Sequence, residues 1–194
     1  VIKWQTSPDN ATWSDVTNTS TTIAFSNVIA TTYYRAVVQN APCNIANSSV
    51  AVVWINTPPV ANFTNTTQCF NVPPTVFTNT STSGSSIPQS IVNALVSGAG
   101  LSGTYTITNS DSWSWNFGDP TSGANNTSLL QNPTHAYTAA GTYNATLITT
   151  TTTLVNGSAV AACSNNVTKQ VTVNPVTTAD YTTSPVCLGG ASAV

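Results

Sequence analysis

Residues 112–120 read SWSWNFGDP, and this stretch decides the fold. Trp113, Trp115 and Phe117 alternate with small polar residues, so an extended chain carries three aromatic side chains on one face and polar groups on the other. The Gly-Asp-Pro that follows ends the strand, because glycine tolerates positive φ, aspartate can hydrogen-bond nearby backbone, and proline lacks a backbone donor. The pattern predicts a half-buried β-strand that stops in a tight turn.

A second stretch, residues 141–147 (GTYNATL), alternates in the same way. Its Tyr143, Ala145 and Leu147 fall on one face, so this strand can pack its apolar side against the aromatic face of the first. The short segment NPTHAY, residues 132–137, lies between the two strands. The spacing predicts two strands of one sandwich core.

The composition predicts an all-β protein. Only 4% of the residues are charged and glutamate is absent, whereas about a quarter of a usual soluble domain is charged. Threonine and valine are abundant, and asparagine, glycine and proline punctuate the chain at regular intervals. Hydroxyl and amide groups must therefore supply most of the solvated surface.

The same composition excludes several classes of function. Three basic residues, Lys3, Arg35 and Lys169, cannot form the positive patch that nucleic-acid binding requires. No apolar run approaches the length of a membrane span, so we expect no direct membrane insertion. Five aspartates and the single His135 offer neither paired carboxylates nor a nucleophile motif. We therefore expect no enzyme, no cofactor and no metal site.

The motifs WNFGD at 115–119 and NPTHAYTAAGTY at 132–143 closely resemble the PKD domain, an immunoglobulin-like β-sandwich of secreted and surface proteins. The resemblance covers roughly residues 58–175. It implies that His135 is packed at a turn and that Asp119 caps the turn after the aromatic strand. The family commonly has WDFGDG, whereas Asn116 and Pro120 stand at two of these positions here.

The resemblance divides the chain into tandem immunoglobulin-like (PKD-like) sandwiches. Residues 1–57 are similar to the C-terminal part of an immunoglobulin-like repeat of large Bacteroidetes surface proteins, such as gliding-motility adhesins. Residues 58–175 are expected to form a complete PKD-like module, with an insertion near 83–110. Residues 176–194 begin the next module, because ADYT at 179–182 repeats ANFT at 61–64. The core aromatics expected from these patterns are Trp4, Trp113, Trp115, Phe117, Tyr137 and Tyr143.

The four cysteines lack the C-x-x-C spacing of a zinc site, and in a secreted protein we expect them to form disulfides. Two pairings remain open. Cys69 can pair with Cys163 within one module. Alternatively, the disulfides join successive modules, an arrangement we call the staple between modules. Each of the four cysteines of this chain then bonds a cysteine of a neighbouring module: Cys43, Cys69, Cys163 and Cys187.

These observations predict a structural repeat segment of a giant secreted adhesin or filament at the cell surface. It would act as a mechanical stalk for adhesion or gliding. Its partners would be neighbouring repeats of the same chain and also other filament chains or surface polysaccharide. The alternative is a carbohydrate-binding accessory module of a secreted hydrolase, which would need an exposed row of aromatic side chains. Asn126 and Asn156 lie in Asn-x-Ser/Thr triplets and are candidate glycosylation sites.

Overall fold

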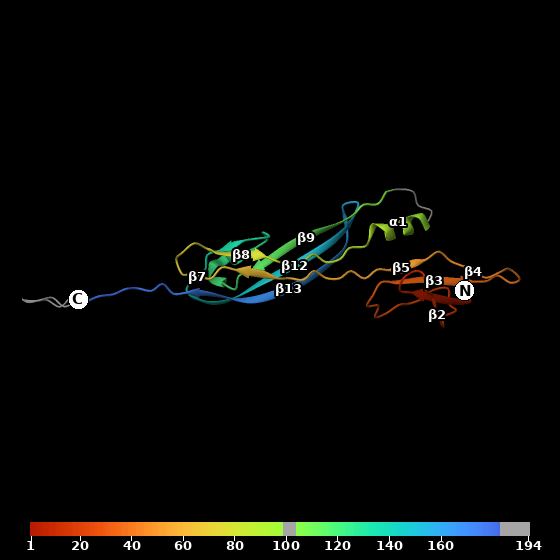
Figure 1. Cartoon of the computed structure of the whole chain (residues 1–194), viewed down its shortest axis with the longest axis horizontal. Coiled ribbons are helices and arrows are strands. Elements are labelled where there is room, and N and C mark those ends of the chain that lie inside the picture. Colours follow the sequence, from red (N-terminus) through yellow and green to blue (C-terminus); the bar gives the residue numbers. More distant parts are fainter. Residues whose placement is uncertain (99–103, 183–194) are drawn as a thin grey trace, which may run out of the picture. The chain divides into compact units, whose positions relative to one another are not determined.

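The chain folds into β-sheets, as the composition predicted. The computed structural model describes residues 1–98 and 104–182, and the arrangement of its elements is drawn in Figure 1. The all-β fold class is confirmed. In chain order the elements are β1 (Lys3–Ser7), β2 (Ser14–Val16), β3 (Thr32–Val38), β4 (Ala46–Asn47), β5 (Ala51–Val53), β6 (Phe63–Asn65), β7 (Gln68–Cys69), β8 (Thr75–Asn79), α1 (Gln89–Gly98), β9 (Ile107–Asn116), the 3₁₀ segment η1 (Pro120–Asn126), β10 (Thr127–Ser128), β11 (Thr134–His135), β12 (Gly141–Val155) and β13 (Ser158–Asn174).

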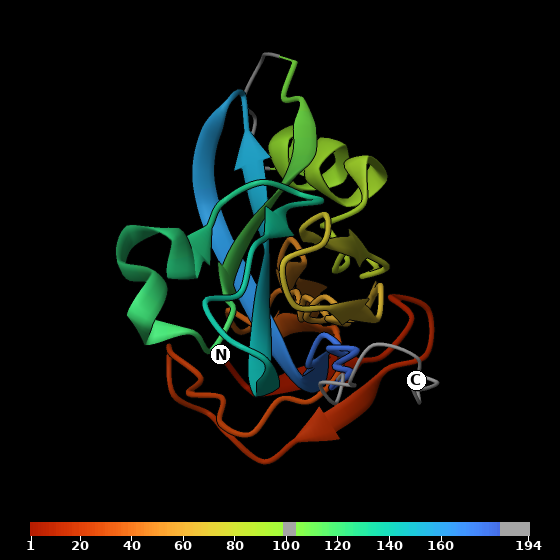
Figure 2. The same cartoon turned by 90° about the vertical axis from the view of Figure 1, so that its left-hand side faces the viewer.

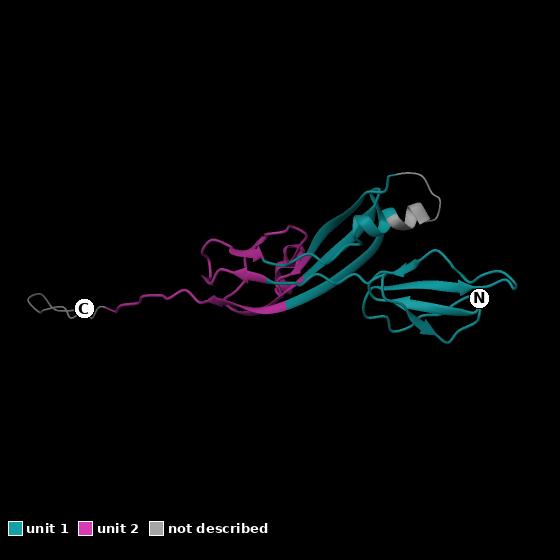
Figure 3. Cartoon of the chain, turned by 45° about the vertical axis from the view of Figure 1, so that its right-hand side comes forward, with its two compact units in different colours: residues 1–62, 80–113, 148–167 teal, residues 63–79, 114–147, 168–194 magenta. Residues whose placement is uncertain are grey.

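The chain divides into two compact units, which Figure 3 shows in different colours. Unit 1 contains residues 1–62, 80–113 and 148–167, and unit 2 contains residues 63–79, 114–147 and 168–194. The long strands β9, β12 and β13 contribute residues to both units. The module boundaries expected at residues 57 and 175 stay a prediction.

In unit 1, the first fifty-odd residues form a sheet in the order β2-β1-β3-β4, and β5 also pairs with β3. Strand β3 buries Tyr34, Ala36 and Val37. Trp4 on β1 is half-buried, and its indole N–H donates to the carbonyl of Ser20 at 2.9 Å. Strand β3, which carries the adjacent Tyr33 and Tyr34, is therefore the central strand of this sheet.

The remaining strands form two further sheets. The larger has the order β10-β9-β12-β13-β7, and the smaller has the order β11-β8-β6. In unit 2 the two sheets meet through aromatic side chains, and Figure 2 shows β6 and β8 on one side of the larger sheet. The ring of Trp115 lies 5.1 Å from that of Phe63 and 5.4 Å from that of Phe77, and Phe117 lies 5.0 Å from Phe77. All four side chains are essentially inaccessible to solvent.

The expected core aromatics differ in how deeply they are buried. Trp115, Phe117 and Tyr137 are buried, whereas Trp4, Trp113 and Tyr143 are half-buried. Phe63 and Phe77, which are not among the expected core aromatics, complete the core. Both lie on the smaller sheet, so only the packing of that sheet on β9 shows their role.

The expected insertion near residues 83–110 contains α1 and the beginning of β9. Strand β9 runs without a break from Ile107 through the aromatic positions to Asn116, so its first residues come from the insertion. Residues 91–96 of the insertion belong to α1. In the part of the chain that the structure describes, no helix has both the length and the apolar character needed to cross a membrane.

Replacing Trp115 by alanine should destabilise the fold strongly. The substitution removes a fully buried indole, and with it the hydrogen bond from the indole N–H to the carbonyl of Leu130 at 2.9 Å. We expect the free energy of unfolding to fall by about 3–5 kcal/mol in a urea titration followed by tryptophan fluorescence and circular dichroism. The control Leu129→Ala, at a side chain that is 78% exposed, should change it by less than about 0.5 kcal/mol. Equal effects of the two substitutions would contradict the core assignment.

Candidate functional site

The turn that follows β9 begins with a glycine that no other residue can replace without strain. Gly118 has φ of 74°, a backbone conformation that side chains with a Cβ rarely adopt. A Cβ at this position would also lie 2.6 Å from the carbonyl oxygen of Asn144 on β12. The Gly118 amide donates to the side-chain oxygen of Asn116 at 2.9 Å, which closes the turn. The chain thus reverses at the place that the Gly-Asp-Pro pattern predicted.

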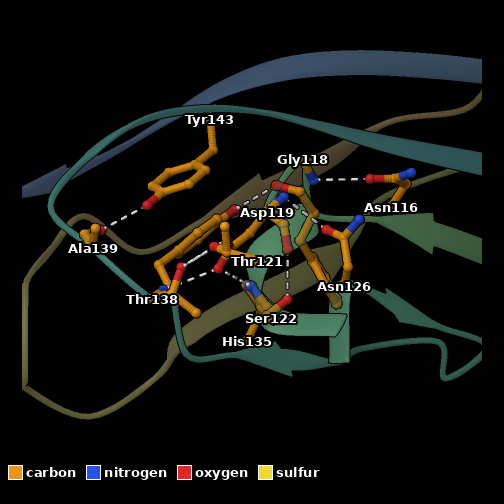
Figure 4. A network of polar contacts seen from close by, with 12 residues as sticks. Asn116, Gly118, Asp119, Thr121, Ser122, Asn126, His135, Thr138, Ala139 and Tyr143 are labelled. Carbon is orange, nitrogen blue, oxygen red and sulfur yellow. Dashed lines mark hydrogen bonds and ion pairs between the residues drawn. The ribbon is translucent and has the colours of Figure 1, made fainter. Parts of the chain in front are cut away.

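Asp119 is the centre of a network of polar contacts, drawn in Figure 4. Its side chain is 1% exposed. One carboxylate oxygen, Oδ1, accepts from the hydroxyls of Thr121 at 2.6 Å and Thr138 at 2.8 Å. The other, Oδ2, accepts from the Thr138 amide at 2.9 Å. The Asp119 amide in turn donates to Asn126 Oδ1 at 2.7 Å, so the aspartate binds both the turn and the segment after β11.

His135 also belongs to this network, and its side chain is buried. Its Nε2 lies 3.3 Å from Asp119 Oδ2, and its ring stacks on Phe117 with the centroids 4.4 Å apart. The His135 and Tyr137 rings are nearly perpendicular, with their centroids 4.6 Å apart. The Tyr137 hydroxyl donates to the carbonyl of Phe117 at 3.2 Å. His135 is therefore packed at the turn before Tyr137, as the resemblance implied.

Burial and hydrogen bonding have opposite effects on the ionisation of Asp119. Burial by itself raises the pKa of a carboxyl, but the hydrogen bonds from Thr121, Thr138 and His135 outweigh it and hold the Asp119 pKa below its ordinary value. Burial lowers the pKa of His135, although Asp119 and the backbone of Asn125 oppose the shift. Burial also raises the pKa of Tyr137. At neutral pH the pair is an ionised carboxylate beside a neutral imidazole.

This arrangement fixes structure, because both oxygens of the carboxylate accept hydrogen bonds. The two hydroxyls beside the pair belong to Thr121 and Thr138, and both donate to the carboxylate. Neither hydroxyl is held by the imidazole, so the pair lacks an activated nucleophile. In the described ranges no three His, Cys, Asp or Glu side chains come together as a metal site. The expected cap is not formed by the Asp119 side chain, which makes no cap hydrogen bond to η1; the carboxylate instead binds the Thr121 hydroxyl and the amide and hydroxyl of Thr138.

A small pocket of about 190 Å³ lies in unit 2 next to this network. It is lined by residues 68–75 and 135–137 together with Val173. Pockets that enclose organic ligands usually measure about 300–1,000 Å³. The pocket is thus too small to hold such a ligand, and the ionisable groups in its lining are Cys69, His135 and Tyr137.

The sequence analysis did not foresee a second polar network, which lies in unit 1. Thr149, Thr151 and Thr153 alternate along β12 and are buried. Thr151 is its centre: its hydroxyl donates to Asp111 Oδ1 at 2.6 Å and accepts from the Gly84 amide at 2.9 Å. The signal was present, because residues 149–153 are five consecutive threonines and their alternate members share a face. A sequence search for apolar core residues does not identify threonines that are buried.

The structure leaves three of the candidate cysteines free: Cys43 and Cys69 are exposed, and Cys163 is half-buried. Cys69 pairs with Asn174 at the end of β13, whereas Cys163 lies in the first half of that strand. The pairing of Cys69 with Cys163 and the staple between modules both stay predictions. Cys187 lies outside the described residues.

The side-chain oxygens of both candidate glycosylation sites accept hydrogen bonds from backbone amides. Asn126 Oδ1 accepts from the Asp119 amide, as described above. Asn156 Oδ1 accepts from the Thr106 amide at 2.8 Å, and the Asn156 amide donates to the Thr106 carbonyl at 2.9 Å. Both side chains have a structural role, and their glycosylation stays a prediction.

Replacing Asp119 by asparagine should cost about 2–4 kcal/mol of unfolding free energy, because an amide cannot accept all the hydrogen bonds that the buried carboxylate accepts. Chemical denaturation at pH 7 measures this loss. The matched control is Asp15→Asn: Asp15 is exposed, pairs with Lys3, and should leave stability nearly unchanged. If Asp119→Asn were as mild as the control, the network would not be a determinant of the fold.

Stability should also depend on pH through His135. Because burial lowers its folded pKa, the unfolded chain binds a proton below about pH 6.5 that the folded chain does not bind. The unfolding free energy should therefore decrease as the pH falls from 7 to 5, by at most about 1.4 kcal/mol per pH unit. His135 is the one histidine of the chain, so His135→Gln should remove this dependence. A native chain equally stable at pH 5 and pH 7 would contradict the assignment.

Comparison with known families and structures gives two matches along the chain and one solved structure. Residues 1–57 match a family described as a domain of unknown function (DUF8696), and residues 98–173 match the PKD domain family. The crystal structure of the PKD1 domain of Vibrio anguillarum Epp is 23% identical and has a TM-score of 0.36; the alignment covers 63% of this chain and 100% of that one. Comparison with curated proteins found no match. PKD domains are generally non-catalytic and typically extracellular, so the match over residues 98–173 indicates a structural or adhesion-type module.

Proposed function

We propose that this chain is a load-bearing segment of a secreted cell-surface adhesin or filament. In this role the segment holds an adhesive region away from the cell and transmits force through successive modules. The observation that carries the proposal is the parallel pairing of β7 with the end of β13, at Gln68 with Val173 and at Cys69 with Asn174. These two strands are early and late segments of the same PKD-like part of the chain.

Parallel pairing of an early strand with a late one suits a module that is pulled at its two ends. Tension draws the early strand toward the N-terminus and the late strand toward the C-terminus, so the strands must slide along each other. Their hydrogen bonds are then loaded together and do not open one after another. One of them joins the Phe70 amide to the carbonyl of Asn174 at 2.8 Å.

Lys169 adds a second connection between the early and late strands in unit 2. Its Nζ on β13 donates to the carbonyl of Phe63 on β6 at 2.5 Å. The same ammonium group lies 5.2 Å from the centre of the Phe63 ring, a favourable cation–π distance. The Lys169 side chain thus links β13 to both the backbone and the ring of Phe63 on β6.

The placement of the basic residues supports a role outside the cell, where proteases are common. The three residues after which a trypsin-like protease could cut are Lys3, Arg35 and Lys169, and they lie in β1, β3 and β13. Proteases preferentially cut exposed loops and flexible tips. None of the loops in the chain offers such a basic residue, which favours a long life in a protease-containing environment.

The alternative role, carbohydrate binding beside a hydrolase, would need a row of exposed aromatic rings. Among the residues that the structure describes, the strongly exposed aromatics are Phe25 and Tyr181, which lie in separate parts of the chain. The aromatic row of β9 is turned into the core at Trp115 and Phe117. No observation therefore favours this alternative.

The proposal is tested by stretching the chain from its two ends in a single-molecule force experiment. Phe70→Pro removes the amide that donates to Asn174, and it should lower the force at which the PKD-like part unfolds. The matched control Phe70→Ala removes the ring but keeps the amide. In chemical denaturation Phe70→Pro should cost about 1 kcal/mol more than Phe70→Ala. Equal unfolding forces for the two variants would mean that the parallel pairing bears no load.

A further inference from the structure

Residues 54–60 lie between β5 and β6, and we call this segment the junction. It joins the sheet of β1 to β5, which we call the N-terminal sheet, to the PKD-like part of the chain. Its second half is held by backbone hydrogen bonds. The amides of Val60 and Thr82 each donate to the carbonyl of the other residue at 3.0 Å, and the Ser85 amide donates to the Thr57 carbonyl at 3.1 Å. The second half of the junction therefore belongs to the PKD-like part.

Thr57 and Ser85 also bind each other through their side chains, an arrangement we call the clasp. The Thr57 amide donates to the Ser85 hydroxyl at 2.7 Å, and the Ser85 amide also donates to the Thr57 hydroxyl at 3.2 Å. Gly84 permits this close approach, because a Cβ at this position would lie 2.5 Å from the Thr57 carbonyl oxygen. The clasp fixes the junction at Thr57.

The first half of the junction is held by the N-terminal sheet. Val53, the last residue of β5, pairs with β3. The Ile55 amide then donates to the hydroxyl of Thr31, the residue before β3, at 3.3 Å. Ile55 is thus bound to the N-terminal sheet and Thr57 to the PKD-like part, and Asn56 lies between these two attachments.

The side chain of Asn56 contacts residues on both sides of it. The indole N–H of Trp54 donates to Asn56 Oδ1 at 2.6 Å, and Asn56 Nδ2 donates to the Thr153 hydroxyl at 3.3 Å. An indole can only donate, so the amide oxygen of Asn56 must face Trp54 and the amide nitrogen faces Thr153. Thr153 is 1% exposed. Asn56 therefore connects a residue next to β5 with the buried threonines of β12.

The series of hydrogen bonds continues beyond Thr153 and returns to the clasp. The Thr153 hydroxyl donates to Asn109 Oδ1 at 3.3 Å, and Asn109 Nδ2 donates to the Gly84 carbonyl at 3.2 Å. Gly84 is the neighbour of Ser85 in the clasp. Hydrogen bonds that follow one another in this way strengthen each other. All of these residues belong to unit 1, which is teal in Figure 3.

We propose that Asn56 is a latch that restricts motion of the N-terminal sheet against the PKD-like part. The latch has two contacts, the Trp54 N–H on one side and the Thr153 hydroxyl on the other. The inference deepens the proposed load-bearing function and rests on it for the purpose of the latch. A flexible linker would extend under tension before it passed force to the next part of the chain, whereas a latched junction passes force on at once.

The test is nuclear magnetic resonance on the whole chain and on Asn56→Ala, which removes both latch contacts and keeps the backbone. Nitrogen-15 relaxation of the native chain should give one tumbling time for the N-terminal sheet and the PKD-like part. In the variant the N-terminal sheet should tumble faster than the PKD-like part. Hydrogen exchange at the Thr57 amide should accelerate roughly tenfold, because the latch no longer supports the clasp. Asn40→Ala, at an exposed asparagine of the same region, is the matched control and should behave like the native chain.

Two milder variants separate the contacts of the latch. Trp54→Phe keeps an aromatic ring but removes the N–H, and Thr153→Val keeps the shape but removes the hydroxyl. Each should accelerate exchange at the Thr57 amide, and the double variant should add little, because either substitution already opens the latch. Unchanged circular dichroism confirms that each variant folds.

Separate tumbling times in the native chain would overturn the latch, and so would additive effects of Trp54→Phe and Thr153→Val. An Asn56→Ala chain that tumbles and exchanges like the native chain would overturn it as well. The force experiment on Phe70 concerns the pairing of β7 with β13 in unit 2, so its failure and the failure of the latch are distinguishable.

Discussion

The structure depends on the contact between the aromatic face of β9 and the two phenylalanines of the smaller sheet. Trp115 and Phe117 meet Phe63 and Phe77 at ring distances near 5 Å, and all four side chains are buried. Burial of large aromatic surfaces is the main favourable term available to a chain with so few charges. The other interactions of unit 2 extend outward from this contact.

The Asp119 network uses the aromatic core as its support. Phe117 supports the His135 ring, and His135 in turn contacts the carboxylate that binds Thr138. The buried charge is tolerated because several donors satisfy its oxygens, so it joins the turn after β9 to the segment after β11. The most buried ionisable group of the described residues thus has a structural role.

In unit 1, strand β12 buries the polar side chains of threonines. Where aromatic residues are lacking, Thr151 and its neighbours bury hydroxyls that bond to Asp111 and the Gly84 backbone. Such a polar interior is stable only when each group has a partner, and the described residues leave no buried side-chain polar atom unsatisfied. A long sheet can therefore continue beyond its aromatic core.

The sequence by itself determined the all-β class, the alternation of β9 and the turn at Gly118 and Asp119, because these follow from local periodicity and backbone preference. It also predicted a packed His135 through its resemblance to a known family. Only the tertiary structure decided that Phe63 and Phe77 cover Trp115 and that Thr138 binds Asp119. These contacts join residues distant in sequence, and strand order and register, which no local pattern encodes, determine which of them meet.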